Sequence, residues 1–206
     1  MSLSDATLPT SRNFPEPQAP SPNPQSPSLP VKVLVTADQI RQSIEQLAAQ
    51  IELREAGRPL TVIAVMTGSI IFLADLIRQL KLPLRVGVIQ ARSYQGTERG
   101  SLAVNLEMLP EVSGRDVLLV DDIFDTGHTL SEVVTLLEKL GPRSIRSAVL
   151  VLKQGKQQVA LRPDYVGFEI PDVFVVGYGL DYNDAFRNLP YLAALEPHDL
   201  ADPSIP

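Results

Sequence analysis

The sequence contains no cysteine and no tryptophan, and only two of its 206 residues are histidine. Without cysteine the chain cannot form disulfides, iron–sulfur clusters or thiolate zinc sites, and it has no cysteine nucleophile. Two histidines are too few for a histidine-rich metal site. Any bound metal is therefore expected to be a hard cation held by oxygen atoms.

Two further absences concern membranes and nucleic acids. No apolar run approaches the roughly 20 residues of a membrane-spanning helix, and the N-terminus lacks the basic and apolar regions of a signal peptide. Lys and Arg number 18 against 24 Asp and Glu, a net charge of −6, which disfavours a basic surface for nucleic acid or anionic lipid. We therefore expect a globular cytoplasmic protein without a membrane or nucleic-acid partner.

Proline is abundant only at the start of the chain. Eight of the 18 prolines fall within residues 1–30, among serines and few apolar side chains. Such a segment buries too little apolar surface to offset its ordering entropy, so we expect a disordered tail over residues 1–30. The remaining length suits one domain, expected over residues 31–206.

Within that domain, short apolar segments alternate with segments of helical periodicity. Thr36 and Gln39 have the spacing of a capping box, which predicts that a helix begins there. Helical spacing also follows residue 70 and residue 130. Strands are expected over residues 60–66, 85–92, 117–120, 145–152 and 173–178. The alternation predicts an α/β fold with an open, mostly parallel, twisted sheet flanked by helices, and ligands beyond the carboxyl ends of its strands.

The loop after Val120 has the most informative pattern. Residues 117–130 read VLLVDDIFDTGHTL. A single helix cap needs one acid, whereas Asp121, Asp122 and Asp125 bring three carboxylates within five residues. The following turn, from Thr126 to Thr129, opens a helix and suits a phosphate group, because helix-terminal N–H groups and hydroxyls converge there.

This segment resembles the ribose-5-phosphate-binding motif of type I phosphoribosyltransferases. A second segment, residues 162–183, reads RPDYVGFEIPDVFVVGYGLDYN and resembles the purine-side segment of the 6-oxopurine (hypoxanthine-guanine) members. The resemblance covers roughly residues 60–190 and implies the type I fold with a small hood. It also implies transfer of phosphoribosyl from phosphoribosyl diphosphate to N9 of hypoxanthine or guanine, giving IMP or GMP and pyrophosphate.

The resemblance assigns the sugar and its phosphate to the first motif. Asp121 and Asp122 would bind the ribose hydroxyls, partly through Mg²⁺, and Asp125 would be the catalytic base or hydrogen-bond partner at purine N7. The 5-phosphate would be bound by Thr126, Gly127, His128 and Thr129. We interpret His128 as a residue of the phosphate loop rather than a catalytic base.

The purine side is assigned in the same way. Lys153, at the end of a strand, would donate to the 6-oxo group, Phe174 would stack on the base, and Val175 would contact the purine edge through its backbone. Ser93 and Tyr94 would begin a loop that closes over the reacting centre and excludes water.

The pyrophosphate side contains one departure from the family. Asp181 would complete a second Mg²⁺ shell and Arg187 would contact pyrophosphate. Thr67 and Gly68 occupy the pyrophosphate loop, where relatives often have Lys-Gly and a non-proline cis peptide. Backbone amides can still bind pyrophosphate there, but the lysine charge is missing, and the sequence leaves the cis geometry open.

Two alternatives and several questions stay open. A phosphoribosyltransferase-fold regulator that binds RNA would need a basic surface, which the net charge of −6 disfavours. A transferase that prefers xanthine is the other alternative, because the sequence does not rank hypoxanthine, guanine and xanthine. The resemblance implies a homodimer or a homotetramer without deciding between them.

Overall fold

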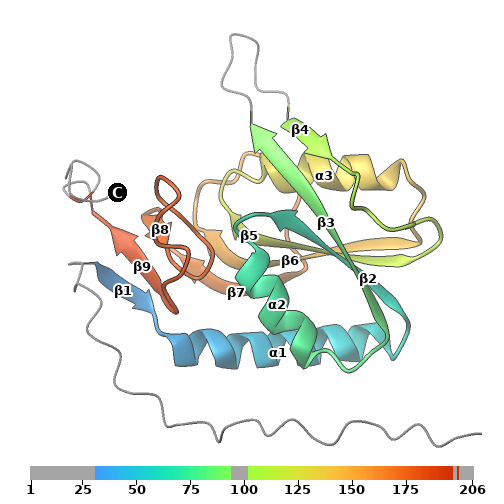
Figure 1. Ribbon diagram of the computed structural model, residues 1–206, viewed down its shortest axis with the longest axis horizontal. Coiled ribbons are helices and arrows are strands. Elements are labelled where there is room, and N and C mark those ends of the chain that lie inside the picture. The colour runs from blue at the N-terminus through green and yellow to red at the C-terminus, as the bar shows by residue number, and fades with distance from the viewer. Residues whose placement is uncertain (1–30, 94–101, 197–198, 200–206) are drawn as a thin grey trace, which may run out of the picture. The chain divides into compact units, whose positions relative to one another are not determined.

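A six-stranded sheet is the centre of the structure, a computed structural model that describes residues 31–93, 102–196 and 199 (Figure 1). Its strand order is β4-β3-β2-β5-β6-β7, and all neighbours are parallel except the edge pair β3–β4. The strands are β2 (Leu60–Met66), β3 (Leu84–Ser93), β4 (Leu102–Asn105), β5 (Asp116–Phe124), β6 (Ser144–Lys153) and β7 (Tyr165–Ile170). The predicted open, mostly parallel sheet is confirmed.

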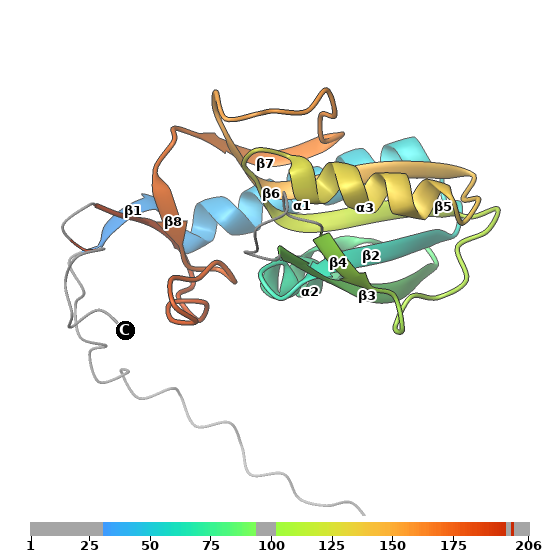
Figure 2. The ribbon, with the colours of Figure 1, turned by 90° about the horizontal axis from the view of Figure 1, so that it is seen from above.

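Helices cover both faces of this sheet (Figures 1 and 2). In β2, Val62 and Ala64 pack toward α1 (Ala37–Glu55) and α2 (Ile70–Gln79), whereas Ile63 and Val65 pack toward α3 (His128–Glu138). Because successive side chains of a strand point to opposite faces, a strand buried on both faces is mainly apolar. This explains the largely apolar segment at residues 60–66, in which the one polar residue, Thr61, accepts a hydrogen bond from Arg115.

Helix α1 begins as the sequence predicts. The Thr36 hydroxyl accepts a hydrogen bond from the Gln39 backbone N–H, and the Gln39 side chain accepts one from the Thr36 backbone N–H, so the capping box is confirmed. The helix ends at a left-handed Ala56, followed by Gly57. In the described residues no helix combines the length and the hydropathy that a membrane crossing would require.

A second, antiparallel sheet forms the predicted hood. Its order is β1-β9-β8, with β1 (Lys32–Val35), β8 (Phe174–Val176) and β9 (Leu192–Leu195). The strand predicted over residues 173–178 is therefore shorter than expected, and it joins this sheet instead of the main one. Gly177 and Gly179 have positive φ angles, which end the strand before Tyr178.

Some sequence predictions fall on residues that are not described. Residues 1–30, predicted to be a tail, and Tyr94 lie outside the described residues, and of Ser93 only the backbone, at the end of β3, is described. The domain boundary at residue 30 and the closing loop stay predictions.

Candidate active site

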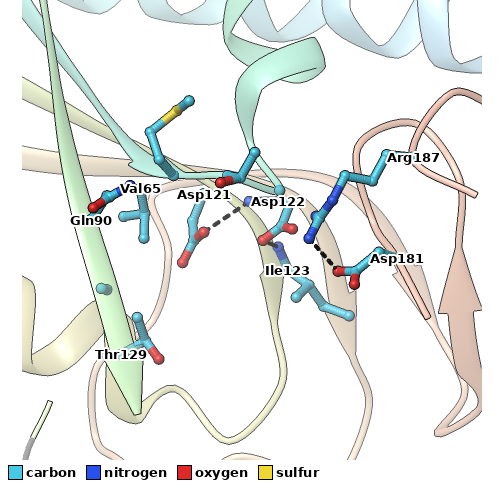
Figure 3. A pocket seen from close by; sticks show the side chains of 12 residues that line it. Val65, Gln90, Asp121, Asp122, Ile123, Thr129, Asp181 and Arg187 are labelled. Carbon is cyan, nitrogen blue, oxygen red and sulfur yellow. Dashed lines mark hydrogen bonds and ion pairs between the residues drawn. The ribbon is translucent and has the colours of Figure 1, made fainter. Parts of the chain in front are cut away.

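A cavity of about 340 Å³ opens at the carboxyl ends of β2, β3 and β5 (Figure 3). This is the edge at which ligands bind in open parallel sheets. The residues lining the cavity are Val65, Met66, Thr67, Gly68, Gln90, Ala91, Asp121, Asp122, Ile123, Thr129, Asp181 and Arg187. Seven of the predicted site residues are among them: Thr67, Gly68, Asp121, Asp122, Thr129, Asp181 and Arg187.

Asp121 and Asp122 are adjacent acids in the carboxyl-terminal part of β5. Asp121 Oδ1 accepts a hydrogen bond from the Asp122 N–H at 3.0 Å, and Asp122 Oδ1 accepts one from the Ile123 N–H at 2.8 Å. Burial raises the pKa of Asp121 well above its usual range, and the neighbouring Asp122 carboxylate raises it further. Burial also raises the pKa of Asp122. A positive group near this pair would favour the charged carboxylates.

The loop after β2 lies against Asp122. The Met66–Thr67 peptide bond is cis, so the geometry that the sequence left open is present although Thr67 replaces the lysine of relatives. A Cβ atom added to Gly68 would lie 1.6 Å from Asp122 Oδ2. Only glycine lets this loop approach the carboxylate so closely, which explains Gly68 without reference to any ligand.

The predicted phosphate turn lies at the start of α3. Gly127, with φ +88°, is the N-cap residue and provides no side-chain cap, so a bound anion could take that place. Thr129 lines the cavity, whereas His128 is exposed, with its Nε2 atom 3.1 Å from Gln158 Oε1. His128 is the first residue of α3, so its role in the phosphate loop stays a prediction.

Arg187 and Asp181 approach the cavity from the segment after β8. Figure 3 shows Arg187 reaching toward Asp122 and the paired Asp181. Arg187 Nη2 lies 2.9 Å from Asp181 Oδ1 and 3.3 Å from Asp184 Oδ1, and Arg187 Nη1 donates to the Gly179 carbonyl at 2.8 Å. This places the cavity's one lining arginine next to Asp122, whose pKa its charge lowers against the effect of burial.

Lys153 and Asp125 meet beside this cavity, at the ends of the neighbouring strands β5 and β6. Lys153 is only 9% exposed, and its Nζ atom lies 3.3 Å from Asp125 Oδ2 and 3.9 Å from Asp172 Oδ1. The other oxygen of Asp125, Oδ1, is buried and has no hydrogen-bond partner among the described residues. A donor and an acceptor are thus held side by side.

Comparison with known proteins identifies the family. A model of the phosphoribosyl transferase domain matches residues 32–183. The hypoxanthine-guanine phosphoribosyltransferase of Staphylococcus aureus (strain Mu50) is 35% identical over 168 residues, which cover 81% of this chain and 94% of that protein. The chain belongs to the hypoxanthine-guanine phosphoribosyltransferase family. The resemblance inferred from the two motifs is confirmed.

Other relatives differ in length but share the fold. A crystal structure of a Bacillus anthracis hypoxanthine-guanine phosphoribosyltransferase is 34% identical, with a TM-score of 0.74, and the match covers 80% of this chain and 98% of that chain. The bifunctional protein TilS/HprT of Listeria innocua is 37% identical over 168 residues, 81% of this chain, but these are only 26% of that protein. The chain therefore spans about a quarter of the length of its bifunctional relatives.

Two residues predicted to contact the base, Phe174 and Val175, lie in β8. Phe174 is 39% exposed, and its ring meets that of Tyr182 edge to face, with centroids 5.5 Å apart and planes at 86°. A core phenylalanine would be buried, so this exposed ring face is available for stacking. Val175 is buried and pairs with Ala194 of β9.

The predicted metal ligands are only partly assembled. Within the described ranges, no three His, Asp or Glu side chains converge to hold a metal ion by themselves. Asp121, Asp122 and Asp181 line one cavity but do not form a complete ligand set. Their oxygen atoms nevertheless fit Mg²⁺, which often binds one or two carboxylates and completes its shell with water and substrate phosphate.

Some residues that line this cavity were not predicted from the sequence. Gln90 and Ala91 lie near the carboxyl end of β3, on the cavity wall, with Gln90 paired in register with Met66. Their place near the carboxyl end of a predicted strand was a usable signal. Nothing in the residue pattern distinguishes Ile123, which lines the cavity directly after Asp122 in β5.

Proposed function

We propose that this chain transfers the 5-phosphoribosyl group of phosphoribosyl diphosphate to N9 of hypoxanthine or guanine. The observation that carries the proposal is the pair of buried Lys153 and half-exposed Asp125, 3.3 Å apart at the carboxyl ends of β6 and β5. An ammonium donor suits a 6-oxo group, and a neighbouring carboxylate suits a proton on purine N7. The spacing of these two groups matches two neighbouring atoms of one edge of a 6-oxopurine.

In the reaction, the bond between C1 and the pyrophosphate oxygen breaks and a bond between C1 and N9 forms. Pyrophosphate leaves with the electron pair of the broken bond, and the proton on N7 passes to Asp125. The Asp125 side chain is 41% exposed, and we assign its carboxylate as the acceptor of that proton.

The sugar becomes positively charged as pyrophosphate departs. Asp121 and Asp122 lie on the cavity wall and bind the ribose hydroxyls in this proposal. Their carboxylates favour a cationic ring, because preorganised negative charge stabilises positive charge that develops in a transition state.

Two anionic groups need separate binding positions. The amides and hydroxyls of residues 126–129 at the start of α3 bind the 5-phosphate, with support from the helix dipole. Arg187 and the backbone amides of Thr67 and Gly68 bind pyrophosphate. Thr129 lines the same cavity as Thr67, Gly68 and Arg187, which supports this assignment.

Mg²⁺ belongs to the proposal. Asp121, Asp122 and Asp181 would hold it together with substrate oxygens, and the ion would neutralise and orient the pyrophosphate. Phosphoribosyl diphosphate is too highly charged to cross a membrane unaided, which favours a cytoplasmic location. A homodimer or a homotetramer stays a prediction.

A steady-state assay with hypoxanthine, guanine, xanthine, adenine and uracil, each with phosphoribosyl diphosphate and Mg²⁺, tests the proposal. We expect the highest kcat/KM with hypoxanthine or guanine. A preference for xanthine would support the alternative transferase. Absence of nucleotide formation with all five bases would contradict the proposed function.

A further inference from the structure

A partly buried hydrogen bond joins α2 to the segment that follows β8. The hydroxyl of Tyr178, a residue only 7% exposed, donates to Asp75 Oδ2 in α2. Asp75 Oδ1 is paired with Arg78, one turn further along the helix. Tyr178 and Asp75 are 103 positions apart in the sequence, so this bond fixes how two distant segments meet.

Both segments lead directly to the cavity. Helix α2 begins at Ile70, immediately after the loop that contains Thr67 and Gly68. On the other side, Gly179 follows Tyr178 and contacts that same loop, because a Cβ on Gly179 would lie 2.0 Å from the Gly68 carbonyl oxygen. The Tyr178–Asp75 bond therefore joins the two segments that form the proposed pyrophosphate side of the cavity: α2 with the loop before it, and the segment that contains Gly179.

Arg187 depends on the same segment for its position. Its guanidinium donates to the Gly179 carbonyl at 2.8 Å, and the Gly179 N–H donates to the Arg187 carbonyl at 2.9 Å. A displacement of Gly179 would move Arg187 relative to Asp122 and Gly68. No comparable contact connects Tyr178 with Phe174 or Lys153 among the bonds of the described residues.

The backbone at Tyr178 needs such an anchor. Tyr178 has a φ angle of +51°, between Gly177 at +94° and Gly179 at +102°. A left-handed conformation is unfavourable for a tyrosine and persists only when surrounding contacts hold it. The Tyr178 N–H donates to the Leu189 carbonyl at 2.8 Å, and the side-chain hydroxyl supplies the second anchor through Asp75.

We propose that Tyr178 is a positioning residue for pyrophosphate, acting through Gly179 on Arg187 and on the loop at Gly68. This inference rests on the proposed function, because it takes that wall of the cavity as the pyrophosphate subsite. A purely structural bond would affect stability alone, whereas a positioning bond affects one substrate and spares the other.

The variant Tyr178→Phe tests this directly, since it removes only the hydroxyl. Asp75 stays paired with Arg78, and a cavity of about 360 Å³ beside these residues lets water reach the carboxylate, so we expect the fold to persist. KM for phosphoribosyl diphosphate should rise about 2- to 12-fold, the range of one lost hydrogen bond. KM for hypoxanthine should change by less than about twofold, because the loss of a hydrogen bond to hypoxanthine would change it by more than that.

Three variants separate the roles of the partners. Asp75→Asn keeps a side-chain acceptor and should behave nearly as wild type, whereas Asp75→Ala should reproduce the effect of Tyr178→Phe. Arg78→Ala breaks the other pair of Asp75 and serves as the matched control, expected to leave both KM values unchanged. The double variant Tyr178→Phe with Asp75→Ala should be no worse than either single variant, because both remove one interaction.

Calorimetric titration with inorganic pyrophosphate and Mg²⁺ provides a readout independent of turnover. Weaker pyrophosphate binding in Tyr178→Phe than in wild type is the expected result. Equal binding by both proteins, a loss of thermal stability alone, or equal increases in both KM values would overturn the inference. If wild type binds pyrophosphate but forms no nucleotide, the proposed function fails while this comparison still decides the role of Tyr178.

Discussion

Replacing Lys153 with Met is the most direct test of how the site selects a base. The side chain is buried, with its ammonium 3.3 Å from Asp125, so the substitution keeps much of the packing and removes one donor. A 6-oxo group accepts a charge-assisted hydrogen bond from this ammonium. The 6-amino group of adenine is a donor itself, so it cannot accept a hydrogen bond from the lysine.

The expected magnitude follows from the burial of this charge. A hydrogen bond to a charged group contributes about 1.5–3 kcal/mol, so kcat/KM for hypoxanthine should fall about 10- to 100-fold in Lys153→Met. A site built around such a bond can reject an analogue that lacks the partner by about 10⁴. We therefore expect wild type to use adenine poorly. In Lys153→Met, the ratio of kcat/KM for hypoxanthine to kcat/KM for adenine should fall, because the variant uses hypoxanthine more slowly.

The assay measures kcat/KM for hypoxanthine, guanine and adenine with both proteins. Lys156→Met is the matched control, because Lys156 pairs with Asp172 at 2.9 Å but is 43% exposed in its side chain. The control should keep the preference for 6-oxopurines. The reasoning is refuted if wild type uses adenine within about tenfold of hypoxanthine, far less than such a bond allows, or if Lys153→Met retains the full preference.

Three further predictions address other parts of the molecule. Asp125→Asn should lower kcat by about 10- to 1,000-fold with saturating substrates, the range of a lost acid–base group, and unchanged kcat would contradict its role. Excess chelator should abolish activity and added Mg²⁺ should restore it, whereas full activity in chelator would exclude the magnesium proposal. Asp116, buried beside Arg143, has its pKa lowered from 3.8 to about 2, chiefly by the hydrogen bond from Arg143. Its charged form therefore stabilises the fold above pH 4, by about 2 kcal/mol, and this contribution declines toward pH 2. Urea unfolding of wild type and Asp116→Asn should show that difference at pH 7 and a smaller one at pH 3, with kcat unchanged.

The strands of the sheet centre could be predicted from the sequence because they are buried on both faces. Residues 60–66 and 117–120 are apolar except for Thr61, and so short an apolar run bounded by turns is typical of a buried strand. Strands β4 and β9 have only four residues each, too few to show a period. Strand β8 was found, but its sheet was not, because pairing with β9 depends on contacts between distant segments.

In the candidate site, too, local patterns could be predicted from the sequence, whereas contacts between distant segments could not. Asp121, Asp122 and Thr129 belong to one continuous motif, so local sequence was sufficient to place them on one cavity. The contact between Gly68 and Asp122, and the bond between Tyr178 and Asp75, join residues far apart in the chain. Such contacts follow from the packing of the whole sheet and have no local pattern.

The charges around the cavity explain why this site needs both backbone donors and a cation. Three carboxylates and one arginine line the space that, in our proposal, receives a substrate with several negative charges. Carboxylates are needed to stabilise a positive sugar, yet they repel the anionic groups attached to it. Helix-terminal amides at α3 and the amides of the loop at Gly68 attract those groups without adding a charged side chain. Arg187 is the only cationic side chain lining the described cavity, so in our proposal its position limits how tightly pyrophosphate binds.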